Sequence, residues 1–266
     1  MVYILQFNIV KEVLILKILS FILGTILGSF YLVLATRLPN KEDVLTSRSR
    51  CDVCKKTLKW YNLIPLLSFI FQRGRCTSCG KKISSEHFFV ELFTGLLFLL
   101  TSIYFPFGYN YLVGLVIVSL MIIIFISDFK YMIILDSPLI TSIILIIILK
   151  FIYFDIKTVF ISILSGIILF LVMFLIEKLG TLILKKDSLG GGDIKFSFII
   201  GLSLGINLGI VSLVLSTFLA LPYALASVKI MKKHELPYGP FLAGALFIVF
   251  FHLDKFTNLI NFLFYL

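Results

Sequence analysis

The chain has 266 residues, of which 60% are hydrophobic and only 14% are charged. A soluble globular domain carries about 25% charged residues, so this composition excludes that class and indicates several membrane-spanning helices in a lipid bilayer. The net charge of +10 does not indicate a nucleic-acid partner, because the basic residues gather between the apolar segments and so report orientation in a membrane.

Six uncharged stretches predict the spans, and they cover residues 18–36, 92–127, 137–149, 158–176, 196–228 and 236–252. A spanning helix needs about 20 residues, so the second and fifth stretches are each long enough for two helices. Breaks are expected at 106–110 and near 201–209. The sequence therefore predicts an all-α polytopic membrane protein with about eight transmembrane helices.

The first span is expected to be retained. Lys11 and Lys17 precede a full-length apolar run, whereas a cleaved signal peptide has a short apolar core that ends in small residues. Removal of the segment is the alternative. Eleven Lys or Arg residues lie between Arg37 and Lys82, which places this loop in the cytoplasm and the amino terminus outside.

All four cysteines lie in that loop, in two Cys-x2-Cys pairs with 21 residues between them, as Cys51, Cys54, Cys76 and Cys79. Two such pairs complete the tetrahedral thiolate shell of structural Zn²⁺. The alternatives are two disulfides, which a reducing cytoplasm disfavours, or idle thiols. Four sulfur ligands leave no open coordination position, so the metal would hold together a loop too small for its own core. The loop's apolar stretch at 63–71 is too short to span, which leaves a position along the membrane surface open.

Two carboxylates are expected at the cytoplasmic ends of predicted helices. Asp128 follows the apolar run 110–127, and Asp193 follows three glycines, Gly190, Gly191 and Gly192. A carboxylate facing lipid costs several kcal/mol, so both side chains should turn inward, where they could share a proton.

Paired carboxyl groups have a specific chemical use. They cannot both ionise easily, so one can take a proton from water while the other donates a proton to a carbonyl oxygen. This pattern predicts amide hydrolysis, and glycines without a Cβ would let an extended substrate peptide approach. The alternative is that the glycines form a flexible connection and that Asp193 caps the helix it begins.

The chain also resembles the type IV prepilin peptidases, a bacterial family of Gly-x-Gly-Asp membrane aspartic proteases. Asp128 opens the segment "DFKYMIILD", which ends at Asp136 and looks like one catalytic motif of the family. Segments 28–39, 83–98 and 238–245 look like family landmarks in the expected order. The family signature Gly-x-Gly-Asp-x-Lys is matched by Gly190, Gly192, Asp193 and Lys195.

The resemblance implies an enzyme that cuts the basic leader from type IV prepilin or pseudopilin precursors at the cytoplasmic face of the bacterial inner membrane. It implies catalysis by Asp128 and Asp193 and a second activity, N-methylation of the new amino terminus with S-adenosylmethionine, for which Glu91 is the candidate residue. The implied substrate-binding residues are Gly190, Gly191, Gly192, Lys195 and Asp136.

Three parts are expected along the chain. Residues 1–36 form an N-terminal segment with the first span, 37–90 form the cytoplasmic zinc-binding loop associated with methylation, and 91–266 form the transmembrane peptidase core. Two other functions stay open, an ion-coupled membrane transporter and a non-catalytic scaffold for pilin assembly. A transporter of this kind often has two repeated halves with broken helices, and the sequence shows no such repeat.

Overall fold

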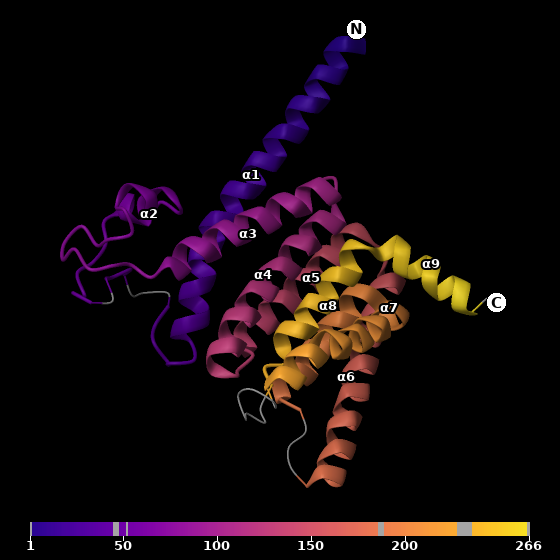
Figure 1. The fold of residues 1–266 in the computed structure, drawn as a ribbon. Coiled ribbons are helices and arrows are strands. Elements are labelled where there is room, and N and C mark those ends of the chain that lie inside the picture. The colour runs from indigo at the N-terminus through magenta and orange to yellow at the C-terminus, as the bar shows by residue number, and fades with distance from the viewer. Residues whose placement is uncertain (1, 45–47, 52, 186–188, 228–235, 265–266) are drawn as a thin grey trace. The chain divides into compact units, whose positions relative to one another are not determined.

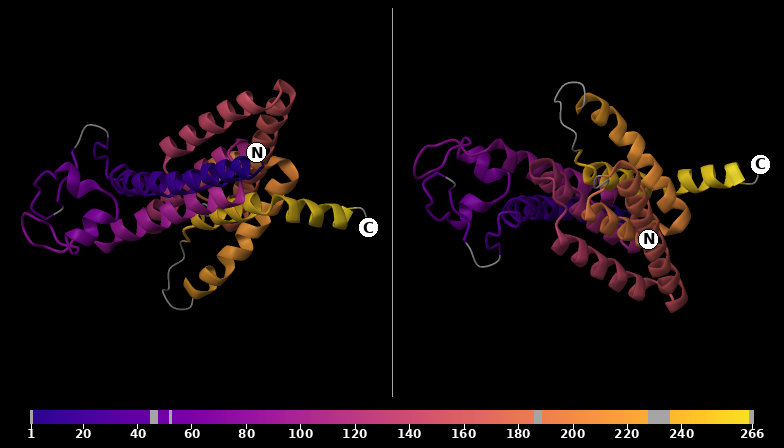
Figure 2. Two further views of the ribbon diagram at one scale, coloured as in Figure 1. Left: turned by 90° about the horizontal axis from the view of Figure 1, so that it is seen from above. Right: turned by 90° about the horizontal axis from the view of Figure 1, so that it is seen from below.

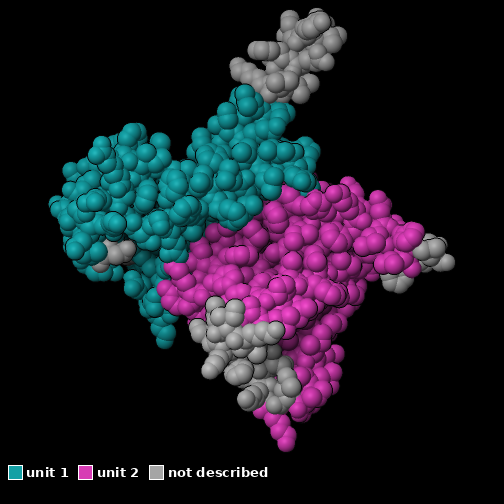
Figure 3. All heavy atoms as spheres, in the orientation of Figure 1, with its two compact units in different colours: residues 1–107 teal, residues 108–266 magenta. Residues whose placement is uncertain are grey.

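The computed structural model describes residues 2–44, 48–51, 53–185, 189–227 and 236–264. Over these ranges the regular elements are helices, with two isolated β-bridges in the cysteine loop, so the predicted all-α class is confirmed. The chain divides into two compact units, Met1–Phe107 and Gly108–Leu266, which Figure 3 colours separately. The functional boundary expected at residue 91 stays a prediction.

In the first unit, α1 (Val2–Arg37) and α3 (Ser85–Tyr104) lie side by side (Figure 1). Small residues bring the two helices together. A Cβ added at Gly24 would lie 2.8 Å from the Cα of Gly95, and one added at Gly28 would lie 2.8 Å from Thr94 Oγ1. Close approach through small residues is a common way for membrane helices to associate. The connecting loop holds the 3₁₀ helix η1 (Trp60–Leu63) and the short helix α2 (Leu67–Phe71).

The second unit contains α4 (Tyr109–Tyr131), α5 (Asp136–Tyr153), α6 (Ile156–Leu184), α7 (Gly191–Ala226), α8 (Gly239–Phe251) and α9 (Leu253–Phe264). Helix α8 contacts both α4 and α7, and most of its side chains are buried. Helices α6 and α7 approach closely at Gly201, where an added Cβ would lie 2.5 Å from the carbonyl oxygen of Ser165. The core of this unit therefore lies around α4 and α8.

Helix α7, in orange in Figure 2, is broken at Gly205 (φ 76°, ψ −177°), a conformation that residues with a side chain rarely adopt. A Cβ added at Gly209 would lie only 3.6 Å from a methyl carbon of Ile200. Nine residues of a straight helix span about 13.5 Å, so the chain must turn back on itself at this glycine. The break lies inside the range predicted from the sequence.

Among the described residues, six helices are long and apolar enough to cross a membrane, and the pair α8 and α9, bent by 87°, would make a seventh. The protein is therefore a polytopic membrane protein. The predicted count of eight is not confirmed. The difference arises at 196–228, which was expected to form two spans, whereas its residues up to Ala226 lie within the single broken element α7.

Candidate functional site

Asp128 and Asp193 come together inside the second unit. Asp128 lies in the last turn of α4, Asp193 lies in the first turn of α7, and both side chains are buried. The backbone beside each acid packs against the same side chain, because Gly192, next to Asp193, and Gly239, whose N–H binds Asp128, both adjoin Ile134. The two acids singled out in the sequence, 65 residues apart, thus belong to one cluster.

The start of α8 fixes the position of the Asp128 carboxylate. The backbone N–H of Gly239 donates a hydrogen bond of 3.0 Å to Asp128 Oδ2. The first N–H groups of a helix have no partner within the helix, and a carboxylate satisfies one of them while also facing the positive end of the helix dipole. Sequence reasoning missed this contact, although Pro240 directly after Gly239 is a sequence signal for a helix start.

Asp193 uses its two carboxylate oxygens differently. Gly190, the residue that caps α7, lies against one oxygen of the carboxyl group, because a Cβ added at Gly190 would lie 3.0 Å from Asp193 Oδ2. Oδ1 is buried and has no hydrogen-bond partner among the described residues. The residue that caps α7 is Gly190, and Asp193 lies inside the helix, so the alternative that Asp193 caps the helix is wrong and its Oδ1 remains available.

The three glycines before Asp193 have different surroundings. A Cβ added at Gly192 would lie 2.6 Å from Ile134 Cβ, and a Cβ added at Gly239 would lie 2.8 Å from Ile134 Cδ1. Ile134 therefore fills the space between the starts of α7 and α8. At Gly191, by contrast, no atom lies within 4 Å of an added Cβ. The space that the sequence suggested for a substrate is open at Gly191 and is occupied by Ile134 at Gly192.

Lys195 and Asp136, the other two residues that the resemblance implies for substrate binding, pair with each other. Lys195 Nζ lies 2.7 Å from Asp136 Oδ1, and both side chains are more than half exposed. The pair joins the beginning of α5 to the first turns of α7. Tyr238, directly before Gly239, joins the start of α8 to α7, because its hydroxyl group hydrogen-bonds Ser216 Oγ at 2.6 Å. Ile134 and Tyr238 lie in segments that resemble family motifs, 128–136 and 238–245, but sequence reasoning named neither of them as a site residue.

A matched pair of substitutions tests this geometry. Gly192→Ala should slow substrate turnover at the site by at least tenfold, because the new methyl group would meet Ile134 Cβ and displace the first turn of α7. Gly244→Ala adds the same methyl group in open space on α8 and should keep most of the activity. Turnover is measured on both purified variants after thermal unfolding shows similar stability. Equal activity of the two variants would contradict the placement of Ile134.

The four cysteines form a second cluster, in the first unit. Their Sγ atoms all lie within 4.8 Å of one another, and all four thiols are free of disulfides. Four thiolates around Zn²⁺, each about 2.3 Å from the metal, lie roughly 3.8 Å apart, so the cluster can bind a metal ion of this kind with small adjustments. The pKa of the Cys76 thiol is lowered to about 6, mainly by a hydrogen bond from the backbone N–H of Ser78.

The two cysteine pairs are built in the same way. The carbonyl oxygen of Cys51 accepts a hydrogen bond from Lys55, and that of Cys76 accepts one from Gly80. Lys55 and Gly80 occupy equivalent positions and both have a positive φ, 57° and 69°. Each turn therefore folds back sharply enough to aim both of its sulfur atoms at a common point.

Glu91 lies in the wall of a cavity of about 360 Å³ that is formed by residues of the first unit. Its carboxylate is buried and accepts a hydrogen bond of 2.8 Å from the backbone N–H of Leu66. The cavity lies between the cysteine loop and the facing turns of α1 and α3. Its polar lining includes Ser29, Arg37, Asn62, Gln72, His87 and Glu91.

The fold and the clusters define a polytopic membrane protein with a buried pair of aspartates and a four-cysteine loop. Residues 22–105 match the bacterial peptidase A24 N-terminal domain, and residues 115–225 match the type IV leader peptidase family. The chain is 32% identical to the prepilin leader peptidase/N-methyltransferase of Bacillus subtilis, over 88% of this chain and 94% of the relative.

Proteins of the same name from Vibrio cholerae and Neisseria gonorrhoeae are 32% and 25% identical. The matches cover 88% and 91% of this chain, and 96% and 93% of those relatives. No solved structure matches the chain. The chain belongs to the type IV leader peptidase family, which confirms the resemblance seen in the sequence.

Proposed function

We propose that this protein is a membrane aspartic endopeptidase that removes the basic leader of type IV prepilin or pseudopilin precursors. It acts at the cytoplasmic face of the bacterial inner membrane and then N-methylates the new amino terminus. The observation that carries the peptidase proposal is that the end of α4 with Asp128 and the start of α7 with Asp193 meet around Ile134 and Gly239. The names of the curated relatives support both activities.

The surroundings of the two aspartates suggest which one acts as the base and which one donates a proton. The N–H of Gly239 stabilises a negative charge on Asp128, so Asp128 is the group that takes a proton from the attacking water. Asp193, with a buried oxygen that has no partner in the described part of the chain, holds the shared proton and donates it to the carbonyl oxygen of the substrate.

The proposed reaction balances within this pair. The water oxygen bonds to the carbonyl carbon and yields a tetrahedral diol, with one proton moved to Asp128 and one moved from Asp193 to the former carbonyl oxygen. The diol then returns a proton to Asp193, Asp128 protonates the amide nitrogen, and the C–N bond breaks. The two products, the leader with its new carboxyl group and the remaining chain with its new amino group, are released without a covalent intermediate.

Substrate binding is assigned to residues around this pair. The peptide lies along Gly190 and Gly191, where the backbone is accessible, and the exposed ion pair of Asp136 and Lys195 lies at the edge of the site. Asp136 offers a negative charge to the basic leader. These roles, like the catalytic roles, are part of the proposal.

For the cysteine cluster we propose a structural Zn²⁺, held by Cys51, Cys54, Cys76 and Cys79. The close approach of the four sulfur atoms supports this assignment, and a closed shell of four thiolates suits a structural metal. When bound, the metal supplies folding free energy to the loop.

For methylation we propose that the cavity beside Glu91 holds the methyl donor, S-adenosylmethionine. Its volume is within the range of small-molecule sites. A buried carboxylate in the wall suits a ligand that carries positive charge, as this donor does on its sulfonium and ammonium groups. Glu91 would hold the donor and the incoming amine, and the Leu66 N–H would orient the carboxylate.

Glu91→Gln separates the two activities. Glutamine keeps the shape of the side chain and can still accept from the Leu66 N–H, but it removes the charge. Methylation should fall by about tenfold or more, because one charge-assisted contact contributes about 1.5–3 kcal/mol, while cleavage should be unchanged. Mass spectrometry of the processed product measures both.

The control is Glu42→Gln, since Glu42 is half-exposed, pairs with Arg50 and does not line the cavity. This variant should methylate normally. Full methylation by Glu91→Gln would remove Glu91 from the proposal and leave the peptidase assignment intact.

A further inference from the structure

The loop of the first unit exposes an unusual set of apolar side chains. Trp60 and Phe71 are 75% and 81% exposed, far beyond what a water-facing loop normally presents for such residues. They belong to an apolar ridge of seven exposed residues. The ridge consists of Trp60, Tyr61, Leu63, Ile64, Leu67, Ile70 and Phe71.

A hydrogen bond fixes the depth of this ridge along the helices. The backbone N–H of Leu66, in the middle of the ridge, donates to Glu91, six residues inside α3. At 1.5 Å per residue, Glu91 lies about 9 Å along the helix from its first residue. On α1 the facing residue is Gly28, nine residues and about 14 Å before Arg37.

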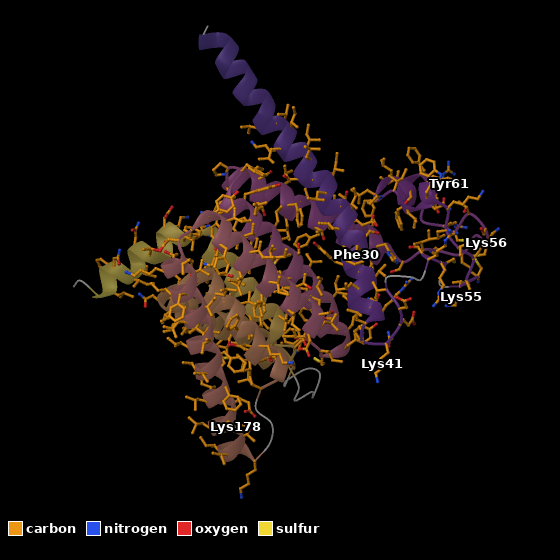
Figure 4. The ribbon with its side chains drawn as sticks, turned by 180° about the vertical axis from the view of Figure 1, so that it is seen from behind. Phe30, Lys41, Lys55, Lys56, Tyr61 and Lys178 are labelled. Carbon is orange, nitrogen blue, oxygen red and sulfur yellow. The ribbon has the colours of Figure 1, made fainter. Side chains whose placement is uncertain are left out.

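The ridge therefore lies beside two helix segments that are long and apolar enough to cross a membrane, Val13–Arg37 and Ser85–Tyr104. Its inner side is already packed, because the Phe69 ring lies 5.3 Å from the Phe88 ring on α3. Figure 1 shows α2 beside these two helices, and Figure 4 places Tyr61 on the side of the loop away from Lys55. Only the outer side of the ridge lacks a packed neighbour in the described part of the unit.

The geometry points to an interaction that the proposed function does not require: the apolar ridge, residues 60–71, is embedded in the interfacial layer of the lipid bilayer. Trp and Tyr favour this layer, where an apolar ring meets the polar headgroups. Basic residues bound the ridge on both sides, Lys59 before it and Arg73 after it, and Lys59 Nζ lies 5.8 Å above the Tyr61 ring.

The charge of the loop selects the kind of lipid. Eleven basic and only three acidic residues lie between Arg37 and Lys82, so the loop suits phospholipids with anionic headgroups. With its ridge in the headgroup layer, the loop would hold its cysteine cluster and the Glu91 cavity against the membrane surface, where a membrane-bound substrate presents its amino terminus.

The chain contains one tryptophan, Trp60, so its fluorescence reports the ridge without any substitution. The full-length protein is reconstituted into vesicles of phosphatidylcholine and phosphatidylglycerol, with or without bromine atoms on the acyl chains near the headgroups. We expect the brominated lipids to remove most of the emission and aqueous iodide to remove little. Strong quenching by iodide with none by brominated lipid would overturn the inference.

Two variants serve as references for a tryptophan in the lipid and for a tryptophan in water. Trp60→Phe combined with Phe71→Trp moves the reporter along the ridge and should be quenched by brominated lipid. Trp60→Phe combined with Lys56→Trp moves it to the exposed cysteine turn and should be quenched by iodide. Shielding of Trp60 from both quenchers would show that a protein surface covers the ridge, and this result would also overturn the inference. Leader cleavage by the same vesicles is a separate readout.

Discussion

Asp128→Asn is expected to abolish cleavage of a prepilin-type precursor without unfolding the protein. Asparagine has nearly the same shape and can still accept the Gly239 N–H at the start of α8. It cannot take a proton from water, and loss of a general base typically slows a reaction by about 10²- to 10⁴-fold. The measurement is single-turnover cleavage by purified enzyme reconstituted in lipid, with precursor binding measured in parallel.

A control at another acid tests whether the effect belongs to the pair. Asp155 caps α6 and accepts hydrogen bonds from Thr158, outside the aspartate cluster, so Asp155→Asn should cleave at nearly the normal rate. Undiminished cleavage by Asp128→Asn would contradict the mechanism. If the unmodified protein bound the precursor and did not cleave it, the scaffold function would be favoured, and ion-dependent transport by the same vesicles would favour a transporter.

Cys51→Ser is expected to remove the bound metal and to unfold the cysteine loop. Binding of a structural Zn²⁺ contributes about 10 kcal/mol or more to folding, which exceeds what a small loop with an exposed apolar side can supply by itself. Elemental analysis should find one zinc per chain in the unmodified protein and much less in the variant. Limited proteolysis should cut the variant's loop rapidly.

Methylation should be lost with the loop, because the cavity beside Glu91 is lined by loop residues that include Cys51 and Cys76. Thr77→Ala is the matched control, since Thr77 lies between two of the cysteines, is exposed and offers no ligand to the cluster. It should retain zinc and methylation. A zinc content that is unchanged in Cys51→Ser, or zero in protein purified without chelators, would contradict the assignment of the cluster.

Local patterns in the sequence were sufficient for the helices and for the cysteine cluster. Long uncharged runs indicate spans because every residue of a spanning helix must be tolerated in the same lipid environment. The two Cys-x2-Cys turns place their sulfur atoms through hydrogen bonds within a few residues, so their spacing predicts the metal cluster. The count of spans was less predictable, because the reversal at Gly205 depends on backbone conformation inside an unbroken apolar run.

Contacts between distant segments explain what sequence reasoning missed around the aspartates. Gly239 lies 111 residues after Asp128, and Ile134 reaches its place only because α7 and α8 both begin beside it. Nothing in the sequence near Ile134 indicates that its side chain fills the space left by Gly192 and Gly239. Similarly, the pairing of Lys195 with Asp136 follows from the meeting of α5 and α7, whereas the sequence only indicated that both residues lie near the site.

The most direct test of the account compares single-turnover cleavage by four proteins: the unmodified chain, Asp128→Asn, Asp193→Asn and the double variant. Groups that act as one unit give strongly non-additive losses. We predict that each single substitution removes nearly all cleavage and that the double variant is no slower than the slower single variant. Normal cleavage by either single variant, or losses that multiply in the double variant, would contradict a shared catalytic pair.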